Sequence, residues 1–418
     1  MIDYPNELDK IFDKLQKNDA KAIIIGGYIR DKLLNIDSKD IDIEVYGVTS
    51  FAYLESLLEE FGSVNSVGKS FGVCKLHFDG LDLDFTLPRQ ENKIAAGHRG
   101  FNVTIQSDLD FVLATRRRDF TINAIGYDVG KKIILDPFNG IDDLKNRVLK
   151  AVDTKSFIED PLRVYRAVQF CARFNLKMDK ELFTLCSKMI KENMLKQLSK
   201  ERLFQEIKKL LLKSQKPSIG FKLFKELGIT KEFDELDFLV HNHWDTLLST
   251  IDNLAQNRKK SERSDLVLLF SAICYNLDRT KTVNFISKFS DEKELLKRVL
   301  SLICNPILKL LSDSELYRLA TKVSIEELIV LNRAVYKERN NELYTICELT
   351  HTRAKELDIL NKSLTPLLMG RDILACGISP SQEFSTILKK GYEAQMDGKF
   401  SSHDDAIKWL KAYLNQLS

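Results

Sequence analysis

The feature that most restricts how this chain can fold is a change of pattern near residue 150. Before it, short apolar segments are separated by turns: KAIIIGG, DIDIEVYG, GVCKLHF, LDLDFTL and KKIILDPFNG. Such segments are typical of β-strands. From about residue 155 glycine becomes rare, and apolar residues recur at helical spacing, as in YRAVQFCARF and LFQEIKKLLL. The pattern predicts an α+β fold, in which a small mixed β-sheet is followed by helices.

Length and charge set the broad class of protein. With 418 residues and 44% hydrophobic content, the chain has room for roughly two to four domains of about 100–200 residues each. Lys and Arg total 63 against 60 Asp and Glu, a net charge of +3. A polyanionic partner would therefore be bound by local basic patches and not by a global field.

The cysteines and the first residues of the chain indicate the cellular compartment of the protein. The seven cysteines form no CxxC pair, which argues against a disulfide framework or a zinc site and favours buried thiols in a reducing environment. The start, MIDYPNELDK, lacks a signal-peptide pattern, and the longest apolar stretch, LVLLFSAIC, is far shorter than the about 20 residues that span a bilayer. We expect a cytoplasmic protein that does not contact a membrane.

Acidic residues alternate along one expected strand. Asp40, Asp42 and Glu44 should project from the same face, where like charges destabilise the strand unless a cation lies between them. Magnesium suits such a place, because it takes few carboxylates and completes its shell with substrate phosphates. A solvent-facing strand of an antiparallel sheet gives the same alternation and remains the alternative.

A glycine turn precedes these acids. In IIIGGYIRD, Gly26 and Gly27 lie between a strand and the start of a helix, where backbone N–H groups can receive a triphosphate with help from Arg30. Further on, LDLDFTLPR supplies Asp82 and Asp84. We favour Asp84 as a third carboxylate near the metal, and Glu44 competes for that role.

A basic segment follows. LATRRRDFTINAIGYD places three consecutive arginines, Arg116, Arg117 and Arg118, before Asp119 and Asn123. Guanidinium groups bind phosphate oxygens bidentately, and the acid and amide can hydrogen-bond a sugar. A basic surface helix is the alternative interpretation.

Five segments occur in an order that resembles a known family. GGYIRD, SKDIDIEVYG, RRRDFTINAIGYD, ILDPFNGIDDLKNRVLKAV and EDPLRVYRAVQFCARF are similar to the class II nucleotidyltransferases, which include tRNA CCA-adding enzymes and bacterial poly(A) polymerases. The likeness covers about residues 20–230, and MGRDILACGISPSQEFSTILKKGYEAQMDGKF resembles the tail of bacterial members. It implies four parts: a catalytic head (1–150), a helical neck with a nucleotide-base template (151–230), a helical body (231–335) and a tRNA-binding helical tail (336–418).

The resemblance also implies roles for individual residues. Asp40 and Asp42 would bind Mg²⁺, and Asp84 would complete the catalytic set. Asp160 and Arg163 of EDPLR would form the protein template that reads the incoming base, with Arg166 stacking or supporting beneath. The implied nucleotide-binding residues are Gly26, Gly27, Arg30, Arg117, Asp119, Asn123, Asp160, Arg163 and Arg166.

Base chemistry supports such a template. Cytosine and adenine each present an amino donor beside a ring-nitrogen acceptor, so one carboxylate and one guanidinium fit both, whereas uracil and guanine invert the order. Residues three apart on a helix share a face. SFIEDPLR also predicts a helix start, with Asp160 as N-cap and Pro161 at the first helical position, or with Ser156 and Glu159 as a capping box.

The resemblance favours one activity within the family. VGKSFGVCKL is more similar to CCA-adding enzymes than to poly(A) polymerases, and RQENKIAAGHRGFNVTIQ resembles the loop associated with A addition; within it His98 and Arg99 are candidates for substrate contact, although a surface histidine is the commoner case. The implied function is addition of C, C and A to the 3′ end of tRNA from CTP and ATP. An A-adding enzyme of a split pathway, a poly(A) polymerase, a nucleotidyltransferase for a small molecule and an inactive RNA-binding protein are the alternatives.

The body resembles a phosphohydrolase domain that has lost its metal ligands. WDTLLSTIDNLAQ and LFSAICYNLD are similar to the places where an HD domain carries histidine and aspartate, but here these positions hold Asp245, Tyr275 and Asn276. Without histidine that metal site cannot form, and the nearby His241 and His243 are expected to be structural. The body is therefore expected to be a degenerate scaffold.

Overall fold

The computed structural model describes residues 2–65, 73–93, 101–258, 261–379 and 382–417. The chain divides into two compact units: Met1–Ser214 with Ile219–Glu232, and Gln215–Ser218 with Phe233–Ser418. The first unit contains the residues expected for the head and neck, and the second contains those expected for the body and tail. The finer division into four parts stays a prediction.

The first unit is built on a mixed β-sheet. Among the described residues its strands follow the order β3, β4, β5, β2, β1, β8, β9. The strands β2 and β5 are parallel, whereas the other neighbours are antiparallel. Their bounds are β1 Lys21–Ile25, β2 Asp40–Tyr46, β3 Val64–Asn65, β4 Val73–Phe78, β5 Leu81–Thr86, β8 Gly126–Asp128 and β9 Ile133–Leu135. A separate antiparallel pair joins β6 (Arg89–Lys93) to β7 (Phe101–Ile105).

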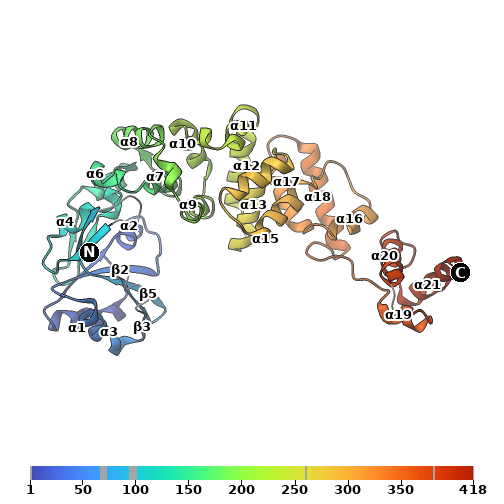
Figure 1. Ribbon diagram of the computed structural model, residues 1–418, viewed down its shortest axis with the longest axis horizontal. Helices are drawn as coiled ribbons and strands as arrows, with labels where there is room; N and C mark the ends of the chain where they lie inside the picture. The colour runs from blue at the N-terminus through green and yellow to red at the C-terminus, as the bar shows by residue number, and fades with distance from the viewer. Residues whose placement is uncertain (1, 66–72, 94–100, 259–260, 380–381, 418) are drawn as a thin grey trace. The chain divides into compact units, whose positions relative to one another are not determined.

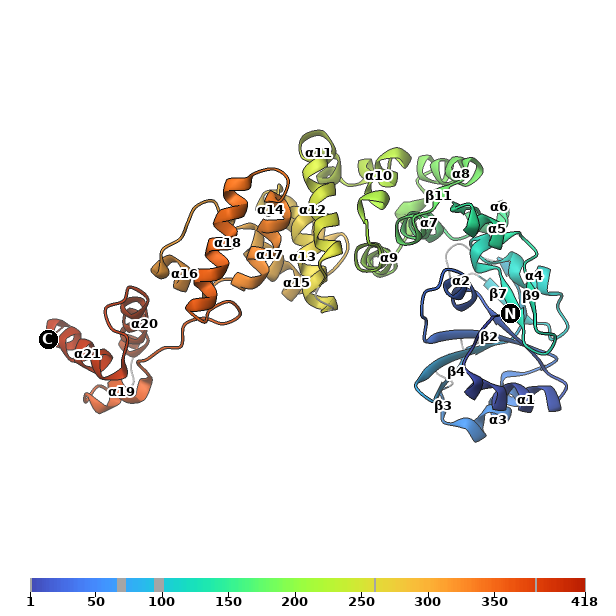
Figure 2. The same ribbon diagram turned by 180° about the vertical axis from the view of Figure 1, so that it is seen from behind.

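Short helices pack around this sheet. They are α1 (Asp9–Lys17), α2 (Gly27–Leu33), α3 (Phe51–Leu58), α4 (Phe111–Arg116) and α5 (Gly140–Lys145). Figures 1 and 2 both show α1 and α3 together on one side of β2 and β5, with α2 on the other side. The apolar positions of the central strands, such as Ile24, Ile43 and Phe85, are fully buried, as expected for a sheet covered on both faces.

Helices that adjoin the sheet complete the first unit. They are α6 (Thr154–Ile158), α7 (Leu162–Phe174), α8 (Lys180–Lys191), α9 (Lys200–Lys213) and α10 (Ser218–Leu227). Side chains of Asp179 and Ser199 cap α8 and α9 by accepting backbone N–H bonds. The expectation of an all-helical neck needs a small correction, because β10 (Val148–Leu149) pairs in parallel with β11 (Lys177–Met178). The two strands connect the end of the head to the turn after α7.

The described part of the second unit consists of helices and connections. The helices are α11 Asp234–Asn242, α12 Trp244–Gln256, α13 Glu262–Cys274, α14 Arg279–Ser287, α15 Lys293–Ile303, α16 Asp313–Ala320, α17 Ile325–Tyr336, α18 Asn341–Glu356, α19 Gly370–Ala375, α20 Gln382–Met396 and α21 His403–Leu417. The apolar stretch LVLLFSAIC lies in α13, which is buried against α12, α15 and α17 (Figure 2). The last helices have a core of their own, which includes Ile373, Ile387 and Leu410.

Two further expectations concern cysteines and membranes. All seven cysteines are free, but not all are buried: Cys304 is exposed and Cys376 is partly exposed. Cys304 follows the last turn of α15, where a side chain no longer faces the helical core. No helix in the described ranges has the length and apolar character needed to cross a membrane.

Candidate active site

The glycine turn brings β1, β2 and the arginine segment together. Gly26 has φ +78° and caps α2, a left-handed conformation that favours glycine. A Cβ atom there would lie 2.5 Å from Arg118 Nη1 and 3.4 Å from Asp42 Oδ2. The Gly26 N–H donates to the carbonyl of Ile125 at 3.1 Å. A glycine is thus required because the backbone runs directly against Arg118 and Asp42.

The acidic residues form two rows across parallel strands. In the β2–β5 register Asp40 is opposite Asp82, and Asp42 is opposite Asp84. Residues opposite each other in a sheet project from the same face, as do residues two apart on one strand. The pairing therefore places Asp84 beside Asp42, as expected for the third carboxylate.

Glu44, the competing third acid, is engaged elsewhere. It is only 1% exposed, accepts a hydrogen bond from Tyr46 Oη at 2.7 Å and pairs with Arg117 Nη2 at 3.3 Å. Burial together with the Glu44 charge raises the pKa of the Tyr46 hydroxyl, which therefore stays protonated as the donor. These partners make Glu44 a structural counter-ion of Arg117.

The environment of Asp42 suits a cation. Burial raises the pKa of Asp42, and the charges of Asp84 and Asp40 raise it further, whereas the charges of Arg118 and Lys75 act against this rise. No group of three or more His, Cys, Asp or Glu side chains in the described ranges is arranged to hold a metal ion by itself. Two carboxylates completed by phosphate oxygens are, however, a set that Mg²⁺ accepts. The donor set of Asp40 and Asp42 therefore fits a divalent ion that is bound together with a phosphate ligand.

Arg118 was not among the nucleotide-binding residues expected from the sequence, which included its neighbour Arg117. Its Nη1 donates to the carbonyl of Asn123 at 3.2 Å, and burial lowers its pKa, with Arg117 adding to the effect. Helix α4 ends at Arg116, so the next two arginines diverge toward Glu44 and Asp42. Three consecutive arginines signal the site, but the sequence does not say which one faces the acids.

Arg30 lies beneath this surface. It is 4% exposed and donates to Asp31 Oδ1 at 2.8 Å from Nε and to Asn123 Oδ1 at 2.5 Å from Nη1. Its guanidinium also stacks over Phe174 at 4.5 Å, and burial lowers its pKa. In this conformation Arg30 orients Asn123, and its own donors face protein groups.

Asp119 is similarly surrounded by protein donors. Its Oδ1 accepts from the Phe120 N–H at 2.9 Å and from Asn123 Nδ2 at 2.8 Å, and its Oδ2 accepts from Arg166 Nε at 2.7 Å. Burial would raise the pKa of Asp119, but the charge of Arg166 and these hydrogen bonds outweigh it and hold the pKa below its ordinary value. Asp119 is therefore an ionised hub that connects Asn123 to α7.

The expected template residues lie at the start of α7. Asp160 Oδ2 accepts from Arg202 Nη2 on α9 at 2.8 Å. Arg163 donates to the carbonyls of Ser156 at 2.8 Å and Arg117 at 2.7 Å. The structure thus brings Arg163 to the arginine segment and Asp160 to α9, and each is engaged with a protein partner. Arg202 was not among the residues expected from the sequence, because nothing local connects it to Asp160.

The helix start differs from expectation. Helix α7 begins at Leu162 with Pro161 in the cap position, although Asp160 Oδ1 still accepts the Leu162 N–H at 3.2 Å. Ser156 lies inside α6, whose cap is Asp153, so the alternative capping box is wrong. The carboxylate of Asp160 therefore has both a capping bond and an ion pair.

Arg166 points back toward the head. Besides Asp119 it approaches Glu206 Oε1 on α9 at 3.8 Å, and it lies over the Phe170 ring at 5.5 Å. The pair with Asp119 raises the pKa of Arg166. Arg166 thus lies beside Phe170, whereas Arg30 and Arg173 lie over the Phe174 ring at 4.5 Å and 4.7 Å.

Tyr275, one of the positions compared with an HD domain, lies in a cluster of hydroxyl and amide groups. Tyr275 Oη lies 3.3 Å from Asn332 Oδ1 and 2.9 Å from Tyr336 Oη. Asn332 also accepts the Ile307 N–H at 3.1 Å, so the cluster connects α13, α17 and the segment after α15. His241 is exposed and bonds the carbonyl of Asp237 at 2.8 Å.

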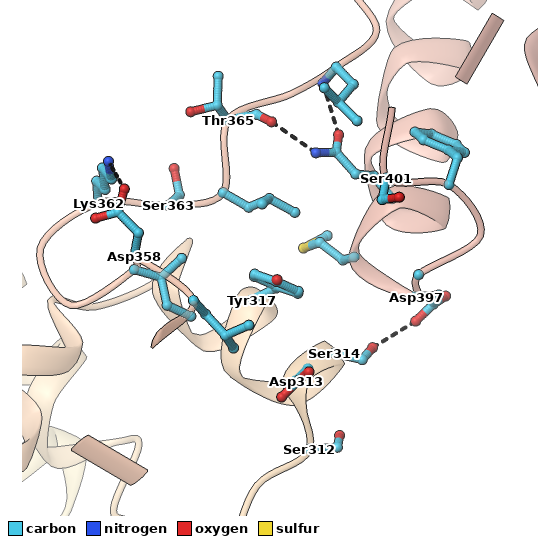
Figure 3. Close-up of a pocket in the computed structure, with 18 residues that line it drawn as sticks. Ser312, Asp313, Ser314, Tyr317, Asp358, Lys362, Ser363, Thr365, Asp397 and Ser401 are labelled. Atoms are coloured by element: carbon cyan, nitrogen blue, oxygen red, sulfur yellow. Dashed lines mark hydrogen bonds and ion pairs between the residues drawn. The ribbon is translucent and has the colours of Figure 1, made fainter. Parts of the chain in front are cut away.

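A cavity of about 710 Å³ lies between α16 and the end of α20 (Figure 3). Ser314 donates to Asp397 at 2.7 Å across it, and Arg318 pairs with the same carboxylate at 2.7 Å. On its other side Gln395 bonds the backbone of Leu367 and Thr365. These polar groups are already engaged with protein partners, and we assign the cavity no ligand.

Two expectations fall outside the described residues. Residues 67–72 of the segment VGKSFGVCKL, and residues 94–100 of the segment with His98 and Arg99, lie in undescribed ranges.

Comparison with known proteins finds relatives of parts of this chain. Residues 22–150 match the model of the poly A polymerase head domain, and residues 175–239 match the probable RNA and SrmB-binding site of polymerase A. The chain is 35% identical over 277 residues to a multifunctional CCA protein of Mannheimia succiniciproducens, covering 63% of this chain and 64% of the relative. It is 32% identical over 271 residues to a CCA-adding enzyme of Buchnera aphidicola, covering 61% and 62%. The matched regions thus span less than two thirds of these relatives.

Solved structures share the fold. The Bacillus stearothermophilus CCA-adding enzyme in complex with CTP superposes with a TM-score of 0.73 at 19% identity, over 99% of both chains. The Thermotoga maritima CCA-adding enzyme complexed with tRNA gives 0.64 at 19% identity, over 99% of this chain and 97% of that one. At such identity these likenesses establish the fold. With the head-domain match they confirm the resemblance inferred from the five sequence segments.

Proposed function

Because residues 22–150 carry the head domain of the poly A polymerase family, we propose that this chain is a tRNA nucleotidyltransferase that adds C, C and A to the 3′ end of tRNA from CTP and ATP and releases pyrophosphate. The observation that carries the proposal is the row of Asp42 and Asp84 against the Gly26 turn and Arg118. Carboxylates, a glycine turn and a guanidinium are the groups that phosphoryl transfer needs in one place.

The carboxylates provide the metal part of this site. Asp40 and Asp42 would hold Mg²⁺, which supplies charge neutralisation on the triphosphate and activation of the terminal hydroxyl. Asp84 adds a third negative charge beside Asp42. Arg118, held against Gly26 by its bond to Asn123, is placed to bind phosphate oxygens bidentately.

Nucleotide selection is assigned to the start of α7. Asp160 would accept the amino group of cytosine or adenine, and Arg163 would donate to the neighbouring ring nitrogen. Both side chains are paired here with Arg202 and with backbone carbonyls, so base binding would exchange these partners. Arg30, Asn123, Asp119 and Arg166 form a chain of hydrogen bonds and ion pairs behind them, and it keeps the phosphate and base portions of the site in fixed register.

The RNA would be bound by the helices. The match of residues 175–239 to an RNA-binding region of polymerase A supports this assignment for the neck, and the tail (336–418) is proposed to bind tRNA as well. With tRNA as its substrate, the enzyme would act in the cytoplasm.

The test is extension of a defined tRNA by the purified chain. With tRNA lacking its last three nucleotides and both CTP and ATP present, the product should be longer by three and then stop; without ATP it should be longer by two. Growth only on tRNA that already ends in CC would indicate an A-adding enzyme. A long A tail from ATP alone would indicate a poly(A) polymerase, and absence of any extension would contradict the proposal.

A further inference from the structure

Strand β4, which lies beside the acidic residues of β5, carries two basic side chains. Strand β4 pairs with β5 so that Lys75 is opposite Asp84 and His77 is opposite Asp82. Lys75 Nζ lies 2.9 Å from both oxygens of Asp84, and His77 Nδ1 lies 3.0 Å from Asp82 Oδ1. Each of the two rows therefore contains a basic side chain on β4, an acidic side chain on β5 and an acidic side chain on β2.

The two rows differ in what surrounds them. Asp82 and His77 are each 69% exposed, so water screens their pair. Asp84 is 33% exposed and next to the buried Asp42. Lys75 thus donates to the carboxylate that adjoins the proposed metal ligand Asp42.

Cationic partners already offset much of the negative charge here. Among the described residues, Lys75 bonds both oxygens of Asp84 and the charge of Arg118 acts on Asp42. An ammonium that bonds both oxygens of Asp84 occupies its lone pairs and repels a second cation. A triphosphate reverses this balance, because its oxygens can take over the ammonium and supply metal ligands at the same time.

We propose that Lys75 is a positioning residue that holds Asp84 in the nucleotide-free protein and makes binding of a divalent ion depend on the nucleotide. This inference rests on the proposed function, since it assumes that Asp40 and Asp42 bind the metal. When the nucleotide enters, Lys75 moves from Asp84 to a phosphate oxygen. Coupling of this kind is reciprocal: the bound metal increases the affinity for the nucleotide by the same factor as the bound nucleotide increases the affinity for the metal.

The test is Mn²⁺ binding to the full chain, followed by the electron paramagnetic resonance signal of free Mn²⁺, with and without CTP and without RNA. The native protein should bind Mn²⁺ weakly alone and more tightly with CTP. Lys75→Met should tighten binding of Mn²⁺ alone by about fivefold, a size typical of one partly exposed ion pair. In this variant the increase in Mn²⁺ affinity that CTP causes should be smaller than in the native protein by the same factor. Lys75→Arg, which keeps the charge, should behave like the native protein.

Lys39→Met is the matched control. Lys39 is exposed and adjoins Asp40 in sequence, so its removal changes the general field by the same charge. Equal tightening in both methionine variants, or Mn²⁺ binding unchanged in Lys75→Met, would overturn the inference and leave the proposed function intact. Absence of Mn²⁺ binding to the native protein even with CTP would refute the metal assignment itself. Lys75 is 64% exposed, so melting temperatures should match among the variants and exclude a folding defect.

Discussion

Arg166 on α7 donates from Nε to Oδ2 of Asp119 at 2.7 Å, across 47 residues of sequence. The bond joins the helix that carries the proposed base template to the segment that follows α4. Through Asn123 it continues to Arg30 and α2. The proposed phosphate and base sites therefore share one buried polar network, in which each charge depends on its neighbour.

Asp119→Asn should destabilise the first unit in a pH-dependent way. The folded pKa of Asp119 lies below its ordinary value, so its ion pair contributes stability above the unfolded pKa of about 4, and this is lost as pH falls through the folded pKa. At pH 7 the variant should be less stable by about 3 kcal/mol, as expected when a buried pair is broken. The difference in the free energy of unfolding between the native protein and the variant should become smaller below about pH 4.

The stability of the Asp119 variant must be measured with a probe that lies in the first unit. The two tryptophans, Trp244 and Trp409, lie in the second unit, so their fluorescence does not report on Asp119. Hydrogen exchange of β1 amides is a suitable probe, because it follows the first unit directly. A stability difference that does not narrow as the pH is lowered below about 4 would contradict the predicted linkage.

Asp40→Asn and Asp42→Asn should each lower nucleotide addition by about 10³-fold or more, because each removes a proposed metal ligand. Binding of tRNA, measured by fluorescence anisotropy, should stay close to native, since the tRNA surface is assigned to the helices. Asp82→Asn is the control: Asp82 is opposite Asp40 in the same sheet but pairs with the exposed His77. Retained turnover in either Asp40 or Asp42 variant would refute their assignment.

Asp160→Ala and Arg163→Ala should relax discrimination against UTP and GTP more than they weaken triphosphate binding. The measurement is single-nucleotide addition with each of the four triphosphates, expressed as kcat/KM ratios. Asp153→Ala is the matched control, because Asp153 caps α6 without touching the template. If Asp160 is only a cap, its alanine variant should lose about 1 kcal/mol of stability with nucleotide choice unchanged, as should the Asp153 variant.

Residues 240–290 should have no metal-dependent phosphohydrolase activity. Tyr275 is engaged with Asn332 and Tyr336, so this position offers hydroxyl and amide groups in place of imidazole. The assay is hydrolysis of a 2′,3′-cyclic phosphate with added divalent metals. Activity that survives in Asp40→Asn could not come from the head and would show a working second site.

Several features of the site were predictable from local sequence. Alternation placed Asp40 and Asp42 on one face of β2, and the Gly26–Gly27 turn was expected between β1 and α2. Both follow from geometry within a few residues: strands have a period of two, and a positive φ is tolerated by glycine. The boundary between sheet and helices near residue 150 has the same local origin.

Other features depended on tertiary pairing. The sequence left Asp84 and Glu44 as alternatives for the third carboxylate. The parallel register of β2 with β5 sets Asp84 opposite Asp42, while Tyr46 and Arg117 engage Glu44, so Asp84 stays our prediction for that role. The register also set Lys75 against Asp84.

The direction of Arg118 toward Asp42, and the partnership of Arg202 with Asp160 across 42 residues, had no local signal. Periodicity shows which side chains share a face. Which distant segment lies opposite that face depends on how strands and helices pack together, and this is a property of the whole fold.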